Sequence, residues 1–359
     1  MPYKPEGDAK KARYVFVAEA PARNEIIDGK PLTGPSGRLH DECLQMAGIP
    51  RRSCYTTNVF NNLVKKSKRG QTEEIRNGDG DLLWRTPRDH QSGFTETGRG
   101  HVERLGEEIS GTSANVVVAM GGVSLNALCE RSGIGKLRGS IWPCTIVEGL
   151  KVIGTFHTAH ALHGNYLARY FITRDYRRAK EQSKYPEIRR PNYQMTLFPS
   201  YVEAMRYLDY ILKDRCDVSV DIEVANRHIS RICFCTSHER TMSVDPSAFS
   251  LEEEAKFWLK VAKVLESTEI TKIFQNGLFD MTFIAMELGI VTQPPIDDTM
   301  VQHHIIFPDF KKNLALLTSL HTDQEYYKDM VHVKGSDIDK ADGRHEVNIH
   351  RSSQQIHPC

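Results

Sequence analysis

Hydrophobic residues in the first half of the chain form short continuous runs, and polar or glycine-rich stretches separate them. Residues 14–18 are such a run, residues 114–120 are almost entirely apolar, and residues 54–58 are expected to form another strand that ends on an amide. Continuous apolar runs of this length are typical of strands buried on both faces. A helix is expected over residues 38–47, with Gly48 as its C-terminal cap. Strands that alternate with helices predict a doubly wound α/β sheet.

The residues that follow the predicted strands are polar or turn-forming. Glu19, Asn58, Gly121 and His157 each stand at or just after the end of a predicted strand. Ligands of such sheets bind at the carboxyl ends of the strands, so these four residues are expected at one rim. A hydrophobic core does not require them there, although a turn-forming amide and a structural rim histidine remain the alternatives for Asn58 and His157.

Residues 65–113 interrupt this pattern. They are polar, glycine-rich and heavily charged, and Trp84 and Phe94 are their few large apolar side chains. We therefore expect a surface insertion that is partly helical near residues 100–109.

Two further stretches divide the chain into domains. Residues 183–200 contain three prolines and are expected to be a linker. From residue 334 the sequence is polar and loses its periodicity, which predicts an irregular tail over residues 334–359. The predicted domains are therefore residues 1–182 and residues 201–333.

The second predicted domain begins with a helix and continues with strands of alternating polarity. The expected order is strands at 218–223, 229–237 and 241–244, a helix at 250–265, a strand at 272–275 and a helix at 278–288. Three meandering strands followed by helix, strand and helix are the order of a ribonuclease-H-like mixed sheet.

Carboxylates stand out within these apolar segments. Asp221 and Glu223 are two positions apart on one predicted strand, so their side chains point to the same face. Burying two like charges together is costly unless a cation lies between them. Asp280 follows another apolar strand end by one helical turn. These residues could bind two divalent ions about 4 Å apart, an arrangement that cleaves phosphodiesters. The alternative is an exposed strand edge.

Composition narrows the possible classes of protein. A chain of 359 residues is too long for one ordinary domain. Its 47 basic and 46 acidic residues nearly cancel, so any DNA-binding surface must come from local basic patches. The polar first residues and the lack of a long apolar run predict neither signal peptide nor membrane span, and hence a cytoplasmic protein. Eight cysteines without a C-x-x-C pair favour reduced thiols.

Two motifs in the C-terminal half are shared with a known family. Asp221-Ile222-Glu223 has the pattern D-x-E, and the pattern N-x-x-x-D runs from Asn276 to Asp280. Residues 199–329 thereby resemble the four-carboxylate (DEDD) 3′–5′ exonucleases, in the form found as the proofreading domain of phage family A DNA polymerases. The resemblance implies that Asp221, Glu223 and Asp280 bind two Mg²⁺ or Mn²⁺ ions. It also implies that Asn276 and Glu223 help to orient single-stranded 3′ ends.

The third motif of that family is missing. The family has Tyr-x-x-x-Asp or His-x-x-x-x-Asp on a late helix, but no tyrosine follows Tyr327. The segment from His332 to Asp337 has the second spacing only formally, because Gly335 lies inside it. Without a fourth carboxylate and a general base, one metal would be weakly held and water poorly activated. The polymerase palm and fingers are also absent, so the chain is similar to the front part of a polymerase.

The N-terminal half resembles the family 4 uracil-DNA glycosylases over residues 13–175. The segments that carry this resemblance are residues 18–22, 29–37, 57–59, 137–139 and 155–158. The family extrudes a uracil from DNA and reads its base-pairing edge. By resemblance, Asn58 offers a donor and an acceptor to that edge, and His157 stabilises negative charge on the 2-oxygen. Glu19 and Leu32 would line the pocket, and Arg138 would hold phosphates.

Several positions depart from the glycosylase pattern. Leu32 stands where the family has an aromatic ring, and loss of stacking costs about 1–3 kcal/mol per base. Thr158 replaces the proline after the histidine, and Ala20 stands where other glycosylase families keep a water-activating aspartate. Asn61-Asn62 occupies the place of a ligand cysteine, and no cysteine pair precedes the first strand. We therefore expect no iron–sulfur cluster.

Together these features predict a DNA-processing protein of phage type. The first hypothesis is a metal-dependent 3′–5′ exonuclease with a uracil-excising domain before it. The second is a module of low activity that keeps both folds to bind DNA or a polymerase partner. Degradation of a labelled single strand, and excision of uracil from DNA, would separate the two hypotheses.

Overall fold

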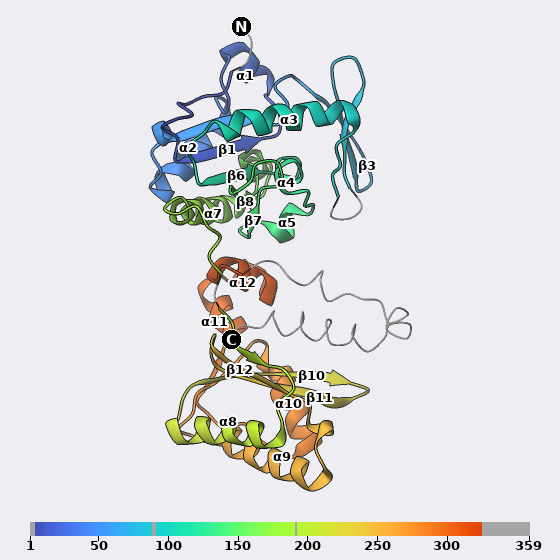
Figure 1. Ribbon diagram of the computed structural model, residues 1–359, viewed down its shortest axis with the longest axis vertical. Coiled ribbons are helices and arrows are strands. Elements are labelled where there is room, and N and C mark those ends of the chain that lie inside the picture. The colour runs from blue at the N-terminus through green and yellow to red at the C-terminus, as the bar shows by residue number, and fades with distance from the viewer. Residues whose placement is uncertain (1–3, 88–90, 191, 325–359) are drawn as a thin grey trace. The chain divides into compact units, whose positions relative to one another are not determined.

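The computed structural model describes residues 4–87, 91–190 and 192–324, which fall into two compact units (Figure 1). Within these ranges, residues 4–189 and 318–324 belong to the first unit, and the remainder belongs to the second. The chain passes from the first unit to the second after residue 189, and it returns to the first unit at residue 318. None of the helices in the described ranges is long and apolar enough to cross a bilayer.

The first unit is built on a five-stranded sheet of order β2-β1-β6-β8-β7. All neighbouring strands are parallel except β7, which runs antiparallel to β8. The strands are β1 (Tyr14–Ala18), β2 (Cys54–Asn58), β6 (Val116–Met120), β7 (Ile141–Pro143) and β8 (Lys151–Thr155). The predicted strands at 14–18 and 54–58 are confirmed with these bounds.

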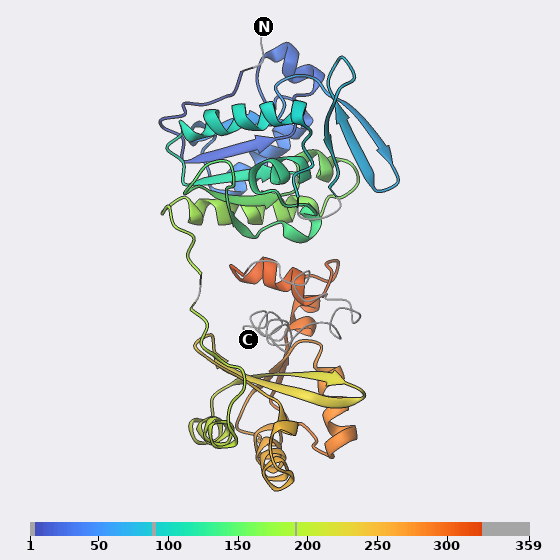
Figure 2. The same ribbon diagram turned by 45° about the vertical axis from the view of Figure 1, so that its right-hand side comes forward.

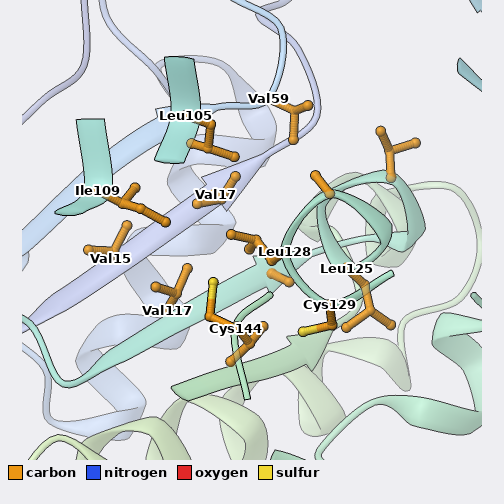
Figure 3. Close-up of a cluster of buried hydrophobic side chains, with 14 of the residues drawn as sticks. Val15, Val17, Val59, Leu105, Ile109, Val117, Leu125, Leu128, Cys129 and Cys144 are labelled. Carbon is orange, nitrogen blue, oxygen red and sulfur yellow. The ribbon is translucent and has the colours of Figure 1, made fainter. Parts of the chain in front are cut away.

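Helices cover both faces of this sheet. They are α1 (Arg23–Asp28), α2 (Pro35–Ala47), α3 (Glu96–Ser110), α4 (Gly122–Cys129), α5 (Ile134–Leu137), α6 (Thr158–Leu162) and α7 (Ala168–Gln182), with a 3-10 turn η1 at Arg51–Ser53. Val15 and Val17 of β1 pack in a cluster with residues of α3 and α4 (Figure 3), whereas Phe16 packs with residues of α2 and α7. This alternation along β1 creates the two cores of a three-layer αβα fold, as predicted.

The expected surface insertion needs a correction. Its first part forms a three-stranded antiparallel sheet of β3 (Lys65–Arg69), β4 (Thr72–Arg76) and β5 (Leu82–Arg85). Its last part is helix α3, whose Leu105 and Ile109 are buried against Val15 and Val117 of the central sheet. The apolar stripe of α3 is narrow and its other positions are polar or glycine, so the sequence alone indicated a surface helix.

The second unit contains a six-stranded mixed sheet of order β14-β13-β10-β11-β12-β9. Its strands are β9 (Met195–Thr196), β10 (Val218–Ala225), β11 (His228–Ser237), β12 (Arg240–Val244), β13 (Lys272–Phe274) and β14 (Ile296–Asp298). Strands β10, β11 and β12 form an antiparallel meander, and β13 and β14 run parallel to β10. The ribonuclease-H-like order is therefore confirmed, and β9 adds a strand that had been assigned to the linker.

Helices pack against the apolar face of this second sheet. These helices are α8 (Tyr201–Asp214), α9 (Leu251–Leu265) and α10 (Gly277–Leu288), with a 3-10 turn η2 at Pro246–Ala248. Two further helices, α11 (Thr299–Ile306) and α12 (Leu314–His321), follow β14, and Thr299 and Leu314 line the pocket on the other face. Val218, Val220 and Ile222 of β10 are buried in one cluster with residues of α8 and α9. Because side chains alternate along a strand, the residues between them face the other side of the sheet. Figure 2 shows α8 and α9 on one side of this sheet.

Candidate functional sites

The carboxyl edge of the first sheet brings the predicted rim residues together. In the parallel register, Ala18 of β1 pairs with Asn58 of β2, and Met120 of β6 pairs with Thr155 of β8. Glu19, Gly121 and His157 follow these strand ends. A Cβ atom on Gly121 would lie 3.7 Å from Cβ of His157, which shows how closely the two loops approach.

His157 is held in one tautomer. It is the N-cap of α6, and its Nδ1 accepts a hydrogen bond of 3.2 Å from the backbone N–H of Ala159. Burial, followed by the positive charge of Lys66, lowers the pKa of His157 to about 4. A neutral imidazole that accepts at Nδ1 carries its proton on Nε2. His157 therefore offers an uncharged hydrogen-bond donor at the rim.

Helix α3 fixes the end of β2. Nη2 of Arg104 donates to the carbonyl oxygens of Asn58 and Val59, each at 2.7 Å, and the Arg104 guanidinium also pairs with Glu108. Asn58 itself is 2% exposed. Arg104 is a positioning residue that sequence reasoning missed, because α3 was assigned to the surface insertion.

The loop before α2 is folded around a buried glutamate. Oε1 of Glu25 accepts the N–H of Leu32 at 2.7 Å, and its Oε2 accepts the N–H of Ala22 at the same distance. A Cβ atom on Gly37 would lie 1.7 Å from the carbonyl oxygen of Leu32, so only glycine fits there. The Leu32 side chain belongs to the core cluster around Phe16, and its contact with a base remains a prediction. Glu25 was not foreseen, although a carboxylate three residues into a helix start is a recognisable cap pattern.

Glu19 is paired with a lysine from the inserted sheet. Nζ of Lys66 on β3 lies 2.5 Å from Oε1 of Glu19 and 3.8 Å from Oε1 of Glu73. Burial raises the pKa of Glu19 above its usual value despite the Lys66 ammonium. Lys66 therefore brings a positive charge to the rim, and no sequence motif had singled it out.

Arg138 is buried in an ion pair with Asp175. It is 2% exposed, and its Nη2 and Nε donate to Asp175 at 2.9 Å and 3.2 Å. Its guanidinium also lies 4.6 Å from the ring centre of Phe171, and Asp175 accepts a further hydrogen bond from Thr155. A buried pair of this kind leaves Arg138 no exposed surface for a phosphate, so the expected phosphate contact is not supported.

The second candidate site lies on the sheet face away from α8 and α9. Asp221 and Glu223 on β10 line a pocket together with Arg231 and Cys233 of β11. In the antiparallel register Asp221 pairs with Cys233 and Glu223 pairs with Arg231, and a bulge follows Glu223. Burial raises the pKa of Asp221 to about 6. The alternation that buries Ile222 thus presents both carboxylates to the pocket.

Asp280 approaches this strand from α10. Its side chain is buried, and its Oδ1 accepts the backbone N–H of Ile222 at 3.1 Å. Burial, followed by the negative charge of Asp221, raises the pKa of Asp280 to about 6, although the Ile222 hydrogen bond opposes this shift. Two like charges in one buried region favour a bound cation. Hard oxygen donors of this kind fit Mg²⁺ or Mn²⁺.

The metal ligands do not form a complete set within the described residues. Among residues 4–87, 91–190 and 192–324, no group of three or more His, Cys, Asp or Glu side chains lies close enough together to hold an ion. The segment from His332 to Asp337, which has the spacing of the missing motif, lies outside the described residues. The donors fit the ions in chemistry, while the complete two-metal arrangement remains a prediction.

Asp298 braces the helix that carries Asp280. Its Oδ2 accepts the N–H of Gly277 at 2.7 Å, and its Oδ1 accepts the N–H of Met300 at 2.8 Å and that of Asn276 at 3.3 Å. One carboxylate therefore joins the first residues of α10 and α11. Asn276, predicted to touch the nucleotide, is the N-cap of α10 with φ of 64°.

Replacing Asp298 with alanine should loosen α10. Loss of the shared cap is expected to cost about 1–2 kcal/mol of unfolding free energy, measured by urea denaturation. The thermal stabilisation that Mg²⁺ gives should also shrink, because Asp280 is less well placed. Asp297→Ala is the matched control, since Asp297 is its exposed neighbour on β14. Equal Mg²⁺ responses in both variants and the wild type would contradict the positioning role.

Comparison with known proteins follows the division into two units. The profile of the uracil DNA glycosylase superfamily matches residues 4–262, and that of the 3'-5' exonuclease family matches residues 200–341. The two matches overlap, but residues 218–262 belong to the second sheet and its helices. The glycosylase-like fold itself therefore lies in the first unit.

Curated relatives agree with both matches. The type-4 uracil-DNA glycosylase of Archaeoglobus fulgidus is 26% identical over 167 residues, which are 45% of this chain and 72% of that protein. The Thermotoga maritima type-4 enzyme is 29% identical, with 47% and 76% covered. A DNA polymerase of Bacillus phage SP01 is 23% identical over 97% of this chain, which spans only 38% of that polymerase's length.

Solved structures match less closely. Escherichia coli RNase D, an exoribonuclease involved in structured RNA processing, is 15% identical, with 45% of this chain and 41% of that chain covered. Its TM-score of 0.33 is too low to support an argument. The family matches, in contrast, cover the chain from residue 4 to residue 341. The chain belongs to the uracil DNA glycosylase superfamily, and it carries a 3′–5′ exonuclease domain behind its glycosylase-like domain.

Proposed function

We propose that this protein is a DNA-processing hydrolase that removes nucleotides from single-stranded 3′ ends and excises uracil. The observation that carries the exonuclease half is the hydrogen bond from Ile222 to Asp280. It brings a carboxylate from α10 to the backbone between Asp221 and Glu223, 58 positions earlier in the chain. The catalytic assignment of Asp221, Glu223 and Asp280 rests on this geometry and on the family motifs, and that of His157 rests on its capping hydrogen bond to Ala159 and on the glycosylase resemblance.

In the exonuclease domain, Asp221, Glu223 and Asp280 would hold two Mg²⁺ or Mn²⁺ ions. Bound metal would polarise the scissile phosphodiester and supply a hydroxide nucleophile near neutral pH. The protein itself contributes a pocket on β10 in which Asp280 is buried and Asp221 half-buried, while Glu223 lies at the exposed end of the strand. Arg231 on the same pocket wall lies opposite Glu223 in the strand register and 4.6 Å from the ring centre of Phe198, which places a positive charge beside the carboxylates.

In the glycosylase domain, leaving-group stabilisation would carry the reaction. Asn58 at the end of β2 would read the uracil edge, and the Nε2–H of His157 would donate to the 2-oxygen as the glycosidic bond breaks. A neutral donor suits this role, because it stabilises the departing anion without first becoming charged. Glu19 and Leu32 would line the pocket. The domain would work without an iron–sulfur cluster.

The likeness to a phage polymerase over nearly the whole chain supports a place for the protein in DNA replication or repair. We propose that it acts in the host cytoplasm on single-stranded 3′ ends and uracil-containing DNA. A polymerase would be its partner, or the remainder of the same enzyme.

A second candidate function is a DNA-binding module of low activity. Two observations favour it. The described residues do not assemble three metal ligands at one point, and Leu32 packs into the core where a stacking ring is expected. A module of this kind would use both folds to grip DNA or a polymerase.

Metal removal provides the direct test. With Mg²⁺ or Mn²⁺, the full chain should release nucleotides from a 5′-labelled single strand, and EDTA should stop this release. In EDTA, a uracil-containing strand should still acquire alkali-labile sites, because excision needs no metal in this proposal. If the protein binds both strands but neither degrades the first nor excises uracil from the second, only the hypothesis of a DNA-binding module would be supported. Degradation that persists in EDTA would contradict the metal-dependent mechanism.

A further inference from the structure

The outer strand of the inserted sheet is strongly basic. Strand β3 has the sequence Lys-Lys-Ser-Lys-Arg, and all five of its residues are exposed. It is an edge strand, because the inserted sheet has the order β3-β4-β5. The hairpin of β3 and β4 projects from the body of the first unit (Figures 1 and 2). A cationic edge of this kind is complementary to the phosphates of a nucleic acid.

The hairpin is rigidly mounted. Ile75 of β4 and Trp84 of β5 are buried in the core cluster that contains Val15 and Val17. Nε1 of Trp84 also donates to Oδ1 of Asn126 on α4 at 3.0 Å. A basic arm that is fixed in this way loses little conformational entropy when it binds a ligand.

Strand register places part of the basic edge beside the glycosylase rim. Lys66 pairs with Ile75 and Lys68 pairs with Glu73, so these four side chains share the face that packs on the domain. The Lys66 ammonium forms an ion pair with Glu19, the rim residue that follows β1. Lys68 is therefore on the same face, two residues further toward the hairpin turn.

Lys68 and Arg69 carry the charges nearest the hairpin turn. Glu73 lies opposite Lys68 in the register, but its Oε1 approaches Lys66. Neither Lys68 nor Arg69 forms an ion pair with another residue in the described part of the chain. Both are exposed. They remain available to an external anion.

We propose that the β3–β4 hairpin is a DNA-binding arm, which holds backbone phosphates beside the glycosylase pocket through Lys68 on the face toward the domain and Arg69 on the other face, next to the hairpin turn. The inference rests on the proposed function, because it assumes that DNA enters the rim at Glu19, Asn58 and His157. Lys66 anchors the arm to that rim, and the two outer cations contact the strand beyond the extruded nucleotide. The contact is with phosphates and carries no sequence preference.

Salt dependence of binding tests the arm. The probe is a uracil-free 20-base-pair DNA duplex in EDTA, titrated with the full chain at several salt concentrations. The variant Lys68→Ala with Arg69→Ala should bind about tenfold more weakly, and its log–log salt slope should fall by about two, because each phosphate contact contributes roughly 0.9. The matched control is Lys11→Ala with Arg52→Ala, which removes the same charge before the amino ends of β1 and β2. Its slope should equal that of the wild type.

Several results would overturn the proposal. One is an unchanged slope in the hairpin variant, and another is an equal loss in both variants, which would indicate a general charge effect. A third is self-association of the hairpin variant with normal DNA binding, since lysines on an edge strand also block strand pairing between copies. Uracil excision is measured in parallel. If excision is absent while the slope changes, the binding arm stands and the proposed activity fails. If excision is present while the slopes are equal, the activity stands and the arm does not.

Discussion

Asp280→Asn is expected to lower exonuclease activity by about a thousandfold, which corresponds to roughly 4 kcal/mol of transition-state stabilisation. Asparagine keeps an oxygen that can accept the N–H of Ile222, so the fold is preserved while the negative charge is lost. The rate is measured as nucleotide release from a labelled single strand at saturating Mg²⁺. Asp209→Asn is the control, because Asp209 is an exposed carboxylate of α8 that pairs with Lys260.

The same substitution should stabilise the protein in the absence of metal. The folded-state pKa of Asp280 is raised to about 6, above its ordinary value of 3.8, so the native state binds the proton more tightly than the unfolded chain. Stability therefore falls as pH rises between these two values. At pH 7 in EDTA, Asp280→Asn should gain about 3 kcal/mol, at about 1.4 kcal/mol for each pKa unit.

With added Mg²⁺, the wild type should become more stable than Asp280→Asn. The ion binds the folded wild type and raises its melting temperature, whereas the variant should respond weakly. Thermal melts with and without Mg²⁺ measure both effects. A variant that digests DNA as fast as the wild type, or that is no more stable than it in EDTA, would remove Asp280 from the proposed metal site.

His157→Ala is expected to slow uracil excision by about a hundredfold to a thousandfold, the usual cost of losing one donor to a developing oxyanion. The matched control is His160→Ala, because His160 is an exposed histidine of the same short helix. Excision is followed under single-turnover conditions in EDTA, where the exonuclease is silent, as the yield of alkali-labile sites. Equal rates for the two variants would exclude His157 from the pocket.

The pH dependence of the wild type gives a second readout for His157. Its pKa is lowered to about 4, so the imidazole stays neutral and keeps its Nε2 proton above that pH. Excision should therefore show no inflection from His157 at its ordinary pKa of 6.5. A rate that declines as pH rises through that value would indicate a charged imidazolium donor and contradict the proposed mechanism.

Local sequence patterns were sufficient for much of the fold. The strands at Tyr14–Ala18 and Cys54–Asn58 were predicted residue for residue, because short segments rich in apolar, aromatic and β-branched residues between turn signals favour strands. The position of α3 was missed. Its buried stripe is narrow, and only packing against β1 distinguishes it from a surface helix.

Contacts between distant segments could not be predicted in this way. Lys66 reaches Glu19 because the inserted sheet packs on the domain, and Asp298 caps α10 because β14 lies beside β13. Arg138 belongs to a motif that resembles a phosphate-contacting segment, yet the fold pairs it with Asp175. A motif specifies residue types and spacing, whereas burial and partners depend on which surfaces meet.

The sequence by itself determined which residues of each strand share a face. Two-residue periodicity alone places Asp221 and Glu223 together, opposite the buried Ile222. Only the tertiary structure decided that Asp280 joins them, that Arg104 secures the end of β2, and that Arg138 is withdrawn from the surface. The physical reason is the separation along the sequence of the residues that interact. Alternation along a strand follows from backbone geometry, while the approach of two segments depends on the packing of the whole unit.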